Sequence, residues 1–251
     1  MKGHELCYAV SDRPDEGYTY GGVVVDNADI FEGDPNRQEG VMAQGNNHGG
    51  IEEANGQWYV FYHRQTDRGS FSRQACAEKI FFDSQGRIRQ AEITSCGLND
   101  GPLAGEGVYP ANICCHLSQG GKTTFSHPMA MGENFPYLTQ DEKDITPEDV
   151  GFPESARRDA AFPVQFVRNF KDQSIMGFKY FDCRGLKRAG LTLRGKAEGT
   201  IVVSTVPMTA ENSDPAAVIG GNLRGCEHGT VDNGIWRSEP CGRRLGIVFY
   251  R

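Results

Sequence analysis

This chain of 251 residues has almost no helical periodicity, no long apolar run and no apolar leader at its start. Hydrophobic residues make up 38% of it, yet no stretch approaches the roughly 18 apolar residues that a membrane span requires. The first residues, Met1 to Cys7, lack the apolar core of a signal peptide, which predicts a cytoplasmic location. We therefore expect no membrane partner.

Clusters of basic residues are also missing. The 33 Asp and Glu residues outnumber the 26 Lys and Arg residues, so the net charge is −7 at pH 7. No run of basic residues is long enough to follow a phosphate backbone. Nucleic acid is therefore not an expected partner.

Metal–thiolate spacing is absent, because none of the eight cysteines forms a Cys-x-x-Cys pair. The adjacent Cys114 and Cys115 would point to opposite faces of a strand, which is a poor arrangement for zinc. Without an export signal, we expect free and mostly buried thiols. The cysteines are Cys7, Cys76, Cys96, Cys114, Cys115, Cys183, Cys226 and Cys241.

Short β-rich runs with turn residues between them fill the first part of the chain. Residues 48–94 predict four consecutive antiparallel strands, which is typical of one blade of a β-propeller. Asn55-Gly56 is the strongest short-range hairpin signal, because both central positions of a type I′ turn need a positive φ. Residues 5–11 and 18–26 predict the outer half of a preceding blade.

The pattern changes near residue 97. Residues 97–107 are rich in glycine and poor in apolar side chains, which predicts a junction. The short strand runs that follow are typical of a β-sandwich. The expected fold is therefore all-β, with propeller blades in residues 1–97 and a jelly-roll-like β-sandwich in residues 98–251.

Several motifs, taken in their order along the chain, resemble glycoside hydrolases of family 43. The resemblance implies the closing part of a five-bladed β-propeller, followed by a sandwich akin to carbohydrate-binding modules. It also implies inverting hydrolysis of α-L-arabinofuranosyl or β-xylosyl linkages, with arabinoxylan, arabinan or xylan as the partner. The motifs are residues 6–14, 18–22, 45–51, 58–64 and 71–78 in the first region, and 177–182 and 193–195 in the second.

The carboxyl groups that such a reaction needs are not evident. Inversion requires two carboxyl groups about 6.5–9.5 Å apart with a water between them. The resemblance implies that the catalytic carboxylates would precede Met1, so we expect a chain truncated at its N-terminus and nearly inactive alone. The chain also ends inside a predicted strand, residues 245–251. Glu52 and Glu53 would face opposite sides of a strand, and Glu78 is expected to pair with an arginine.

Three residues are predicted to serve the sugar site. By resemblance, His48 lies at the propeller axis, supports the active-site geometry and helps to hold a calcium ion through water. Arg73 is expected to hydrogen-bond sugar hydroxyls or to hold a carboxylate, and Asn47 to hydrogen-bond a sugar. The alternatives are a loop histidine without a role, an exposed arginine at a strand end and an ordinary turn residue. Calcium is the one cofactor that the resemblance implies.

The aromatic residues of the second region leave two interpretations open. Phe178, Tyr180 and Trp236 could stack on a sugar if they are exposed, but a buried core is the expected role. A non-catalytic carbohydrate-binding module is the alternative function. A third interpretation is an incomplete propeller whose open blade edges pair with another chain, so the oligomeric state stays open.

Overall fold

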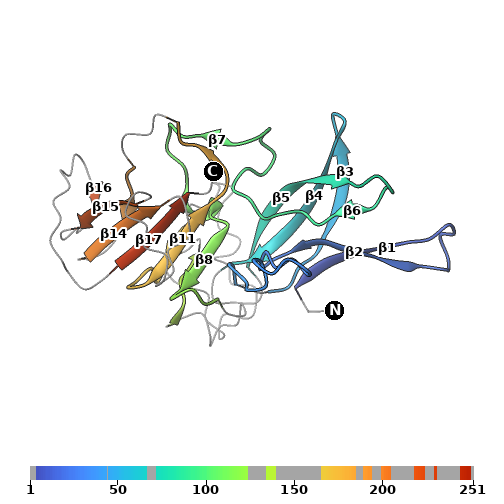
Figure 1. The fold of residues 1–251 in the computed structure, drawn as a ribbon, viewed down its shortest axis with the longest axis horizontal. Helices are drawn as coiled ribbons and strands as arrows, with labels where there is room; N and C mark the ends of the chain where they lie inside the picture. Colours follow the sequence, from blue (N-terminus) through green and yellow to red (C-terminus); the bar gives the residue numbers. More distant parts are fainter. Residues whose placement is uncertain are drawn as a thin grey trace, which may run out of the picture.

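The protein is described by a computed structural model that covers residues 4–43, 45–66, 72–123, 134–139, 165–184, 189–193, 199–204, 218–223, 229–230 and 244–249. Strands dominate these residues, and a short 3₁₀ helix lies at Ala111–Ile113 (Figure 1). No helix in the described ranges has the length and apolar character needed to cross a membrane. The all-β fold class is confirmed.

The four strands expected in residues 48–94 form one antiparallel sheet whose spatial order follows the sequence (Figure 1). Asn55 and Gly56 have φ angles of 53° and 80°, so the predicted tight hairpin is confirmed. The strands are β3 (Gly49–Ala54), β4 (Gln57–Gln65), β5 (Arg73–Phe82) and β6 (Ile88–Arg89).

A separate hairpin, β1 (Glu5–Val10) with β2 (Thr19–Asp26), packs beside the outer strand of this sheet. Ala91 donates its backbone N–H to the carbonyl of Val24 at 2.7 Å. The hydroxyl of Tyr8 accepts from the backbone N–H of Ile88 at 3.1 Å. The arrangement agrees with one four-stranded blade beside half of a neighbouring blade, while closure into a propeller stays a prediction.

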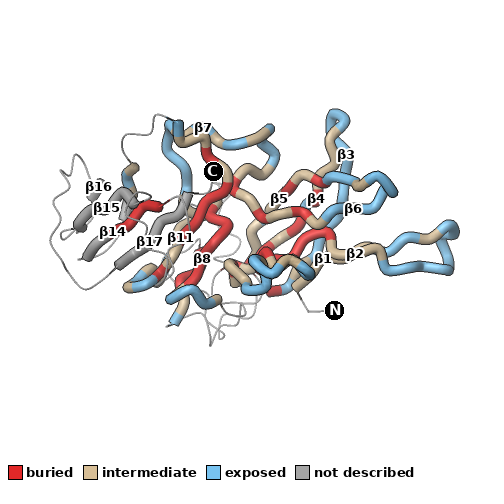
Figure 2. Tube along the Cα trace, in the orientation of Figure 1, coloured by how far each residue is buried: buried red, intermediate tan, exposed pale blue. Residues whose placement is uncertain are grey.

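The core of the first region comes from alternate residues of the strands. Val60, Tyr62 and Ile80 are buried together with Val24 and Val25 of β2. The opposite face of β4 and the edge strand β3 are much more exposed (Figure 2). One face of the four-stranded sheet is thus closed by packing, and the other is left to solvent.

The second region contains a mixed five-stranded sheet in the order β15-β14-β17-β11-β8. Its outer pairs are antiparallel and its two central pairs are parallel. The strands are β8 (His116–Gln119), β11 (Ser174–Phe178), β14 (Gly199–Ser204), β15 (Val218–Leu223) and β17 (Arg244–Phe249).

Three two-stranded pairs accompany this sheet. None of them joins the five-stranded sheet, so the β-sandwich of residues 98–251 stays a prediction. The pairs are β7 (Leu103–Ala104) with β12 (Phe181–Asp182), β9 (Tyr137–Thr139) with β10 (Phe166–Arg168), and β13 (Thr192–Leu193) with β16 (Gly229–Thr230).

The two regions exchange core residues across the predicted boundary near residue 97. Met42 of the first region packs in the cluster that contains Leu117 and Phe178. Cys115 of the second region packs in the core that contains Val60. The regions therefore share a buried boundary, and their division at residue 97 stays a prediction.

The structure describes two of the three aromatic residues discussed for the second region and six of the eight cysteines. Phe178 is buried as expected, while the hydroxyl of the half-buried Tyr180 donates to Glu92 at 2.6 Å. Trp236 lies outside the described residues. The six described cysteines are free thiols, and Cys226 and Cys241 lie outside the described ranges.

Candidate functional site

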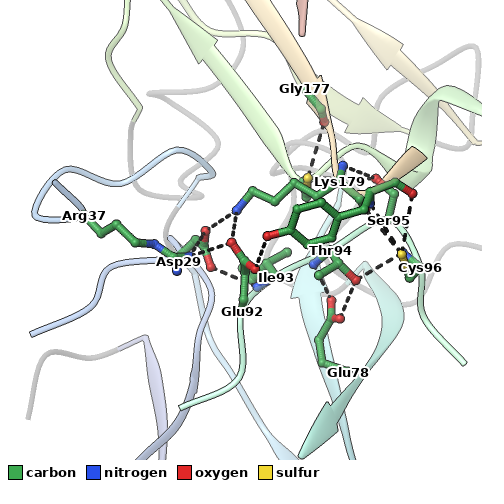
Figure 3. A network of polar contacts seen from close by, with 12 residues as sticks. Asp29, Arg37, Glu78, Glu92, Ile93, Thr94, Ser95, Cys96, Gly177 and Lys179 are labelled. Carbon is green, nitrogen blue, oxygen red and sulfur yellow. Dashed lines mark hydrogen bonds and ion pairs between the residues drawn. The ribbon is translucent and has the colours of Figure 1, made fainter. Parts of the chain in front are cut away.

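A buried cluster of charges lies where the two regions meet (Figure 3). The ammonium of Lys179, which follows β11, lies 2.7 Å from Asp29 Oδ2 and 2.9 Å from Glu92 Oε1. Arg37 approaches the same Asp29 oxygen at 2.5 Å. Residues from the loop after β2, from the segment after β6 and from the second region thus meet at one point, which we call the boundary cluster.

The charges of the boundary cluster stabilise one another. Burial alone would raise the pKa of Glu92, but Lys179, Tyr180 and Arg37 hold that pKa below its ordinary value. Burial alone would lower the pKa of Lys179, but Asp29 and Glu92 outweigh it and hold the pKa well above the ordinary value. Both groups are therefore ionised at neutral pH and engaged with each other.

Glu78 of β5 is a third carboxyl group near this boundary, and it is buried. Its oxygens accept from the backbone N–H and the hydroxyl of Thr94, both at 2.6 Å. Burial raises the pKa of Glu78 to about 8, so the group is protonated at pH 7. The expected arginine partner was wrong, because Arg64 donates instead to Gln74 and to the carbonyls of Asn112 and Cys114.

These three carboxyl groups are engaged within the fold. Asp29 and Glu78 are each 4% exposed, and Glu92 is held by Lys179 and Tyr180. A general acid or base must reach the substrate within hydrogen-bond distance. Asp29 and Glu78 do not meet this condition because they are buried, and Glu92 uses both of its oxygens within the fold.

A second polar cluster lies at the beginning of β3 and the end of β4, and we call it the histidine site. It contains His48, His63, Asn47 and Arg73. Nδ1 of His48 and Nε2 of His63 are 2.9 Å apart, which is a hydrogen-bond distance. The ring planes are inclined by 48° with centroids 5.1 Å apart. His48 is exposed and His63 is half-buried.

Gly49 allows this pair to form. A Cβ at residue 49 would lie 2.1 Å from the carbonyl oxygen of Phe61, so any side chain there would force β3 away from β4. Gly49 pairs with Tyr62, which places the preceding His48 opposite His63. The backbones of β3 and β4 therefore approach closely at Gly49, whereas a Cβ at Gly50 would meet open space.

Asn27 anchors the loop that carries His48. Its amide nitrogen points at the carbonyls of Gly45, Asn46 and His63, at 3.4, 3.2 and 3.3 Å. Nδ1 of His4 donates to the carbonyl of Gly45 at 2.9 Å. The loop is therefore fixed to the end of β4 by side chains from both ends of the β1–β2 hairpin.

The other two predicted residues have definite places in the histidine site. Asn47 donates its amide to the carbonyl of His4 at 3.4 Å, and its Oδ1 is buried without a hydrogen-bond partner among the described residues. Arg73 donates to the carbonyl of Ser72 at 3.0 Å and is half-buried, which lowers the pKa of its guanidinium. Their roles toward a sugar stay predictions.

His63 is the member of the site that sequence reasoning missed. Burial lowers its pKa, and the charge of Arg73 and the neighbouring His48 lower it further. His63 is therefore neutral at pH 7. The sequence does contain the information that places His63 opposite His48. A two-residue hairpin at Asn55-Gly56 pairs residues 54 and 57, and the same register pairs residues 48 and 63.

A calcium site at His48 finds little support in the residues around it. Calcium prefers six to eight oxygen ligands, with carboxylates prominent among them. Within the part of the chain that the structure describes, no group of three or more His, Cys, Asp or Glu side chains could hold a metal ion. Among the described residues, Asn27 and Asn47 each have a buried Oδ1 atom without a hydrogen-bond partner. This donor set does not fit calcium.

Comparison with known proteins gives one substantial similarity. No model of a known protein family matches this chain. A protein of Thermoclostridium stercorarium named "Xylosidase/arabinosidase" is 44% identical over 205 residues, which are 80% of this chain and 40% of that protein. The chain thus spans two-fifths of the length of this relative. The resemblance to glycosidases of the xylosidase/arabinosidase type is confirmed.

A solved structure shows a weaker likeness. It is a glycoside hydrolase family 43 arabinoxylan arabinofuranohydrolase from Bacillus subtilis, in complex with cellotetraose. The identity is 21% and the TM-score is 0.30, over 47% of this chain and 23% of the other. A similarity of this size adds no argument to the sequence match.

Proposed function

We propose that this chain is the sugar-binding part of a family 43-type glycoside hydrolase that acts on arabinofuranosyl or xylosyl linkages. The observation that supports this most is the identity of 44% over 205 residues to a protein named "Xylosidase/arabinosidase". The reaction of the whole protein would be inverting hydrolysis, with arabinoxylan, arabinan or xylan as substrates.

Within this proposal, the histidine site contacts the sugar. His48 is exposed and fixed at a loop that Gly49 and Asn27 hold in place. Arg73, at the start of the neighbouring strand β5, brings a guanidinium fork to the same end of the sheet, where it suits sugar hydroxyls. Imidazole, amide and guanidinium groups are the polar groups that orient a neutral sugar.

Carbohydrate binding without hydrolysis is the second candidate. The carboxyl groups of Asp29, Glu78 and Glu92 are engaged by Lys179 and Thr94, which favours binding over catalysis for this chain alone. An acid and a base each contribute about 10²–10⁴-fold to a rate, so their loss removes most of the turnover. We expect binding of oligosaccharides and little or no hydrolysis.

The test combines turnover and binding on the purified full chain. Release of 4-nitrophenol from its α-L-arabinofuranoside and β-xyloside measures hydrolysis, and calorimetry with arabinoxylan oligosaccharides measures binding. His48→Ala is the test variant, and Ser84→Ala, in the exposed turn after β5, is the matched control. Binding lost only in His48→Ala supports the proposal.

The other outcomes are equally decisive. Turnover that is lost in His48→Ala would mean that the chain contains a complete catalytic site, against the expectation for its carboxyl groups. Binding that is equal in both variants would remove His48 from the sugar site. No binding by the wild-type chain would overturn the proposed function.

A further inference from the structure

The hydrogen bond between His48 and His63 needs one donor and one acceptor. A neutral imidazole carries a proton on one nitrogen and a lone pair on the other. At 2.9 Å, either His63 donates from Nε2 to His48 Nδ1, or His48 donates from Nδ1 to His63 Nε2. The two arrangements give His48 opposite tautomers, so they offer opposite chemistry to a ligand.

The second nitrogen of His63 distinguishes the two arrangements. Nδ1 of His63 is buried and has no hydrogen-bond partner among the described residues. If His48 were the donor, the proton of the neutral His63 would lie on Nδ1 as a buried N–H without an acceptor. If His63 is the donor, Nδ1 is only an unpaired acceptor. Orphaned buried N–H groups are the rarer of the two, so the geometry favours His63 as the donor.

The surroundings also keep His63 in its neutral form. A cationic His63 would also carry a proton on the buried Nδ1 that has no acceptor among the described residues, so the same geometry disfavours a positive charge on His63. A neutral His63 whose Nε2–H donates to His48 leaves the proton of His48 on Nε2. His48 is exposed, so its Nε2–H group is the hydrogen-bond donor that remains available to a ligand.

We propose that His63 is a positioning residue that fixes His48 in the Nε2–H tautomer, so that the histidine site recognises an acceptor oxygen. The acceptor would be a hydroxyl or ring oxygen of a sugar, and this part of the inference rests on the proposed function. A metal ion, or the hydrogens of a metal-bound water, would need a lone pair at this nitrogen, which the tautomer does not provide. The inference thus separates sugar binding from the calcium role expected for His48.

Nitrogen NMR of the full chain tests the tautomer directly. Histidine labelled with ¹⁵N is observed at pH 8, above the ordinary histidine pKa of about 6.5. The signal of His48 is assigned by its loss in His48→Gln. We expect a single His48 tautomer with the proton on Nε2. A proton on Nδ1 would overturn the inference, whatever the variants do.

Two variants of His63 test its role. His63→Phe keeps a ring but removes the donor, so His48 should become a mixture of tautomers. His63→Gln keeps an amide N–H near the place of Nε2, so the single tautomer should return. An unchanged His48 spectrum in a folded His63→Phe variant would contradict a positioning role. If that variant does not fold, the spectra of the wild type and His63→Gln decide.

Titration with ligands separates this inference from the proposed function. Arabinoxylan oligosaccharides should shift the His48 Nε2 signal, and their affinity should fall about tenfold in His63→Phe and recover in His63→Gln, as expected for one oriented hydrogen bond. Calcium chloride alone should leave the signal unchanged, and a calcium-induced shift would contradict the donor role. If no sugar shifts the signal, the proposed function fails while the tautomer assignment is decided by the spectra above.

Discussion

The boundary cluster joins polar side chains from distant parts of the sequence, whereas the histidine site joins residues of three consecutive strand segments, and the two differ in which groups remain accessible to a ligand. At the boundary, Lys179 lies between Asp29 and Glu92, and Tyr180 donates to the remaining Glu92 oxygen. At the histidine site, His48 is exposed and uses one nitrogen for the pair with His63.

This difference shows why strong electrostatic perturbation does not by itself identify a functional site. Large pKa shifts at the boundary belong to Lys179 and Glu78, which are buried and engaged within the fold. Ion pairs in a protein interior perturb pKa values just as catalytic sites do. A binding site also needs groups that are accessible and oriented, and His48 meets this condition.

The largest expected effect comes from removing the cation of the boundary cluster. Lys179→Met removes the buried cation that Asp29 and Glu92 share and leaves them the half-buried Arg37 as their cation, and a broken buried ion pair costs about 3–5 kcal/mol. Urea unfolding at pH 7 measures the loss. Lys122→Met, at an exposed residue, is the control and should change the free energy of unfolding by less than about 0.5 kcal/mol. Equal losses would mean that the boundary cluster does not hold the regions together.

Glu78 should make stability depend on pH. Its pKa rises from 4.5 to about 8 on folding, so between these values the folded chain holds a proton that the unfolded chain has released. Stability therefore falls as pH rises from about 4.5 to 8, by about 1.4 kcal/mol for each pKa unit. Unfolding curves of the wild type and Glu78→Gln at several pH values should show this slope in the wild type alone. The same slope in both would exclude Glu78 as its source.

Gly49→Ala should disturb the histidine site and Gly50→Ala should not. The added methyl group would collide with the carbonyl of Phe61 at residue 49 but meet open space at residue 50. We expect a loss of about 1–3 kcal/mol for Gly49→Ala, as for other overpacked positions, together with separation of His48 from His63. Thermal unfolding and histidine NMR measure both effects. A similar response at the two glycines would argue against the tight pairing of β3 and β4.

The smallest effect concerns Arg73. Its positive charge is one cause of the lowered pKa of His63, after burial. In Arg73→Gln the pKa of His63 should rise but stay below the ordinary value, because burial remains. Histidine titration by NMR measures the change, with Arg89→Gln at an exposed residue of β6 as the control. An unchanged pKa would place the guanidinium too far from His63 to act on it.

Short-range sequence features predict part of the histidine site. The Asn55-Gly56 turn fixes the register of β3 on β4, and that register alone pairs residue 48 with residue 63. Gly49 then allows the close approach of β3 to β4. His48 was predicted as a site residue, whereas His63 was missed because it stands in a run of aromatic strand residues.

The boundary cluster could not be predicted in this way. Asp29 and Lys179 are 150 residues apart, and no local pattern links a loop after β2 to the end of β11. The parallel pairing of β17 with β11 and β14 is non-local for the same reason. Glu78 was assigned an arginine partner from charge alone, but its orientation in the core selects Thr94. Tertiary packing decided these contacts.

Mapping a bound sugar on the two clusters is the most direct measurement. Backbone and histidine NMR signals of the full chain are followed while arabinoxylan oligosaccharides are added. We expect shifts at His48, His63 and Arg73, and none at Lys179 or Glu92. Shifts centred on the boundary cluster, or no shift at the histidine site at saturating sugar, would contradict the assignment of sugar binding to His48.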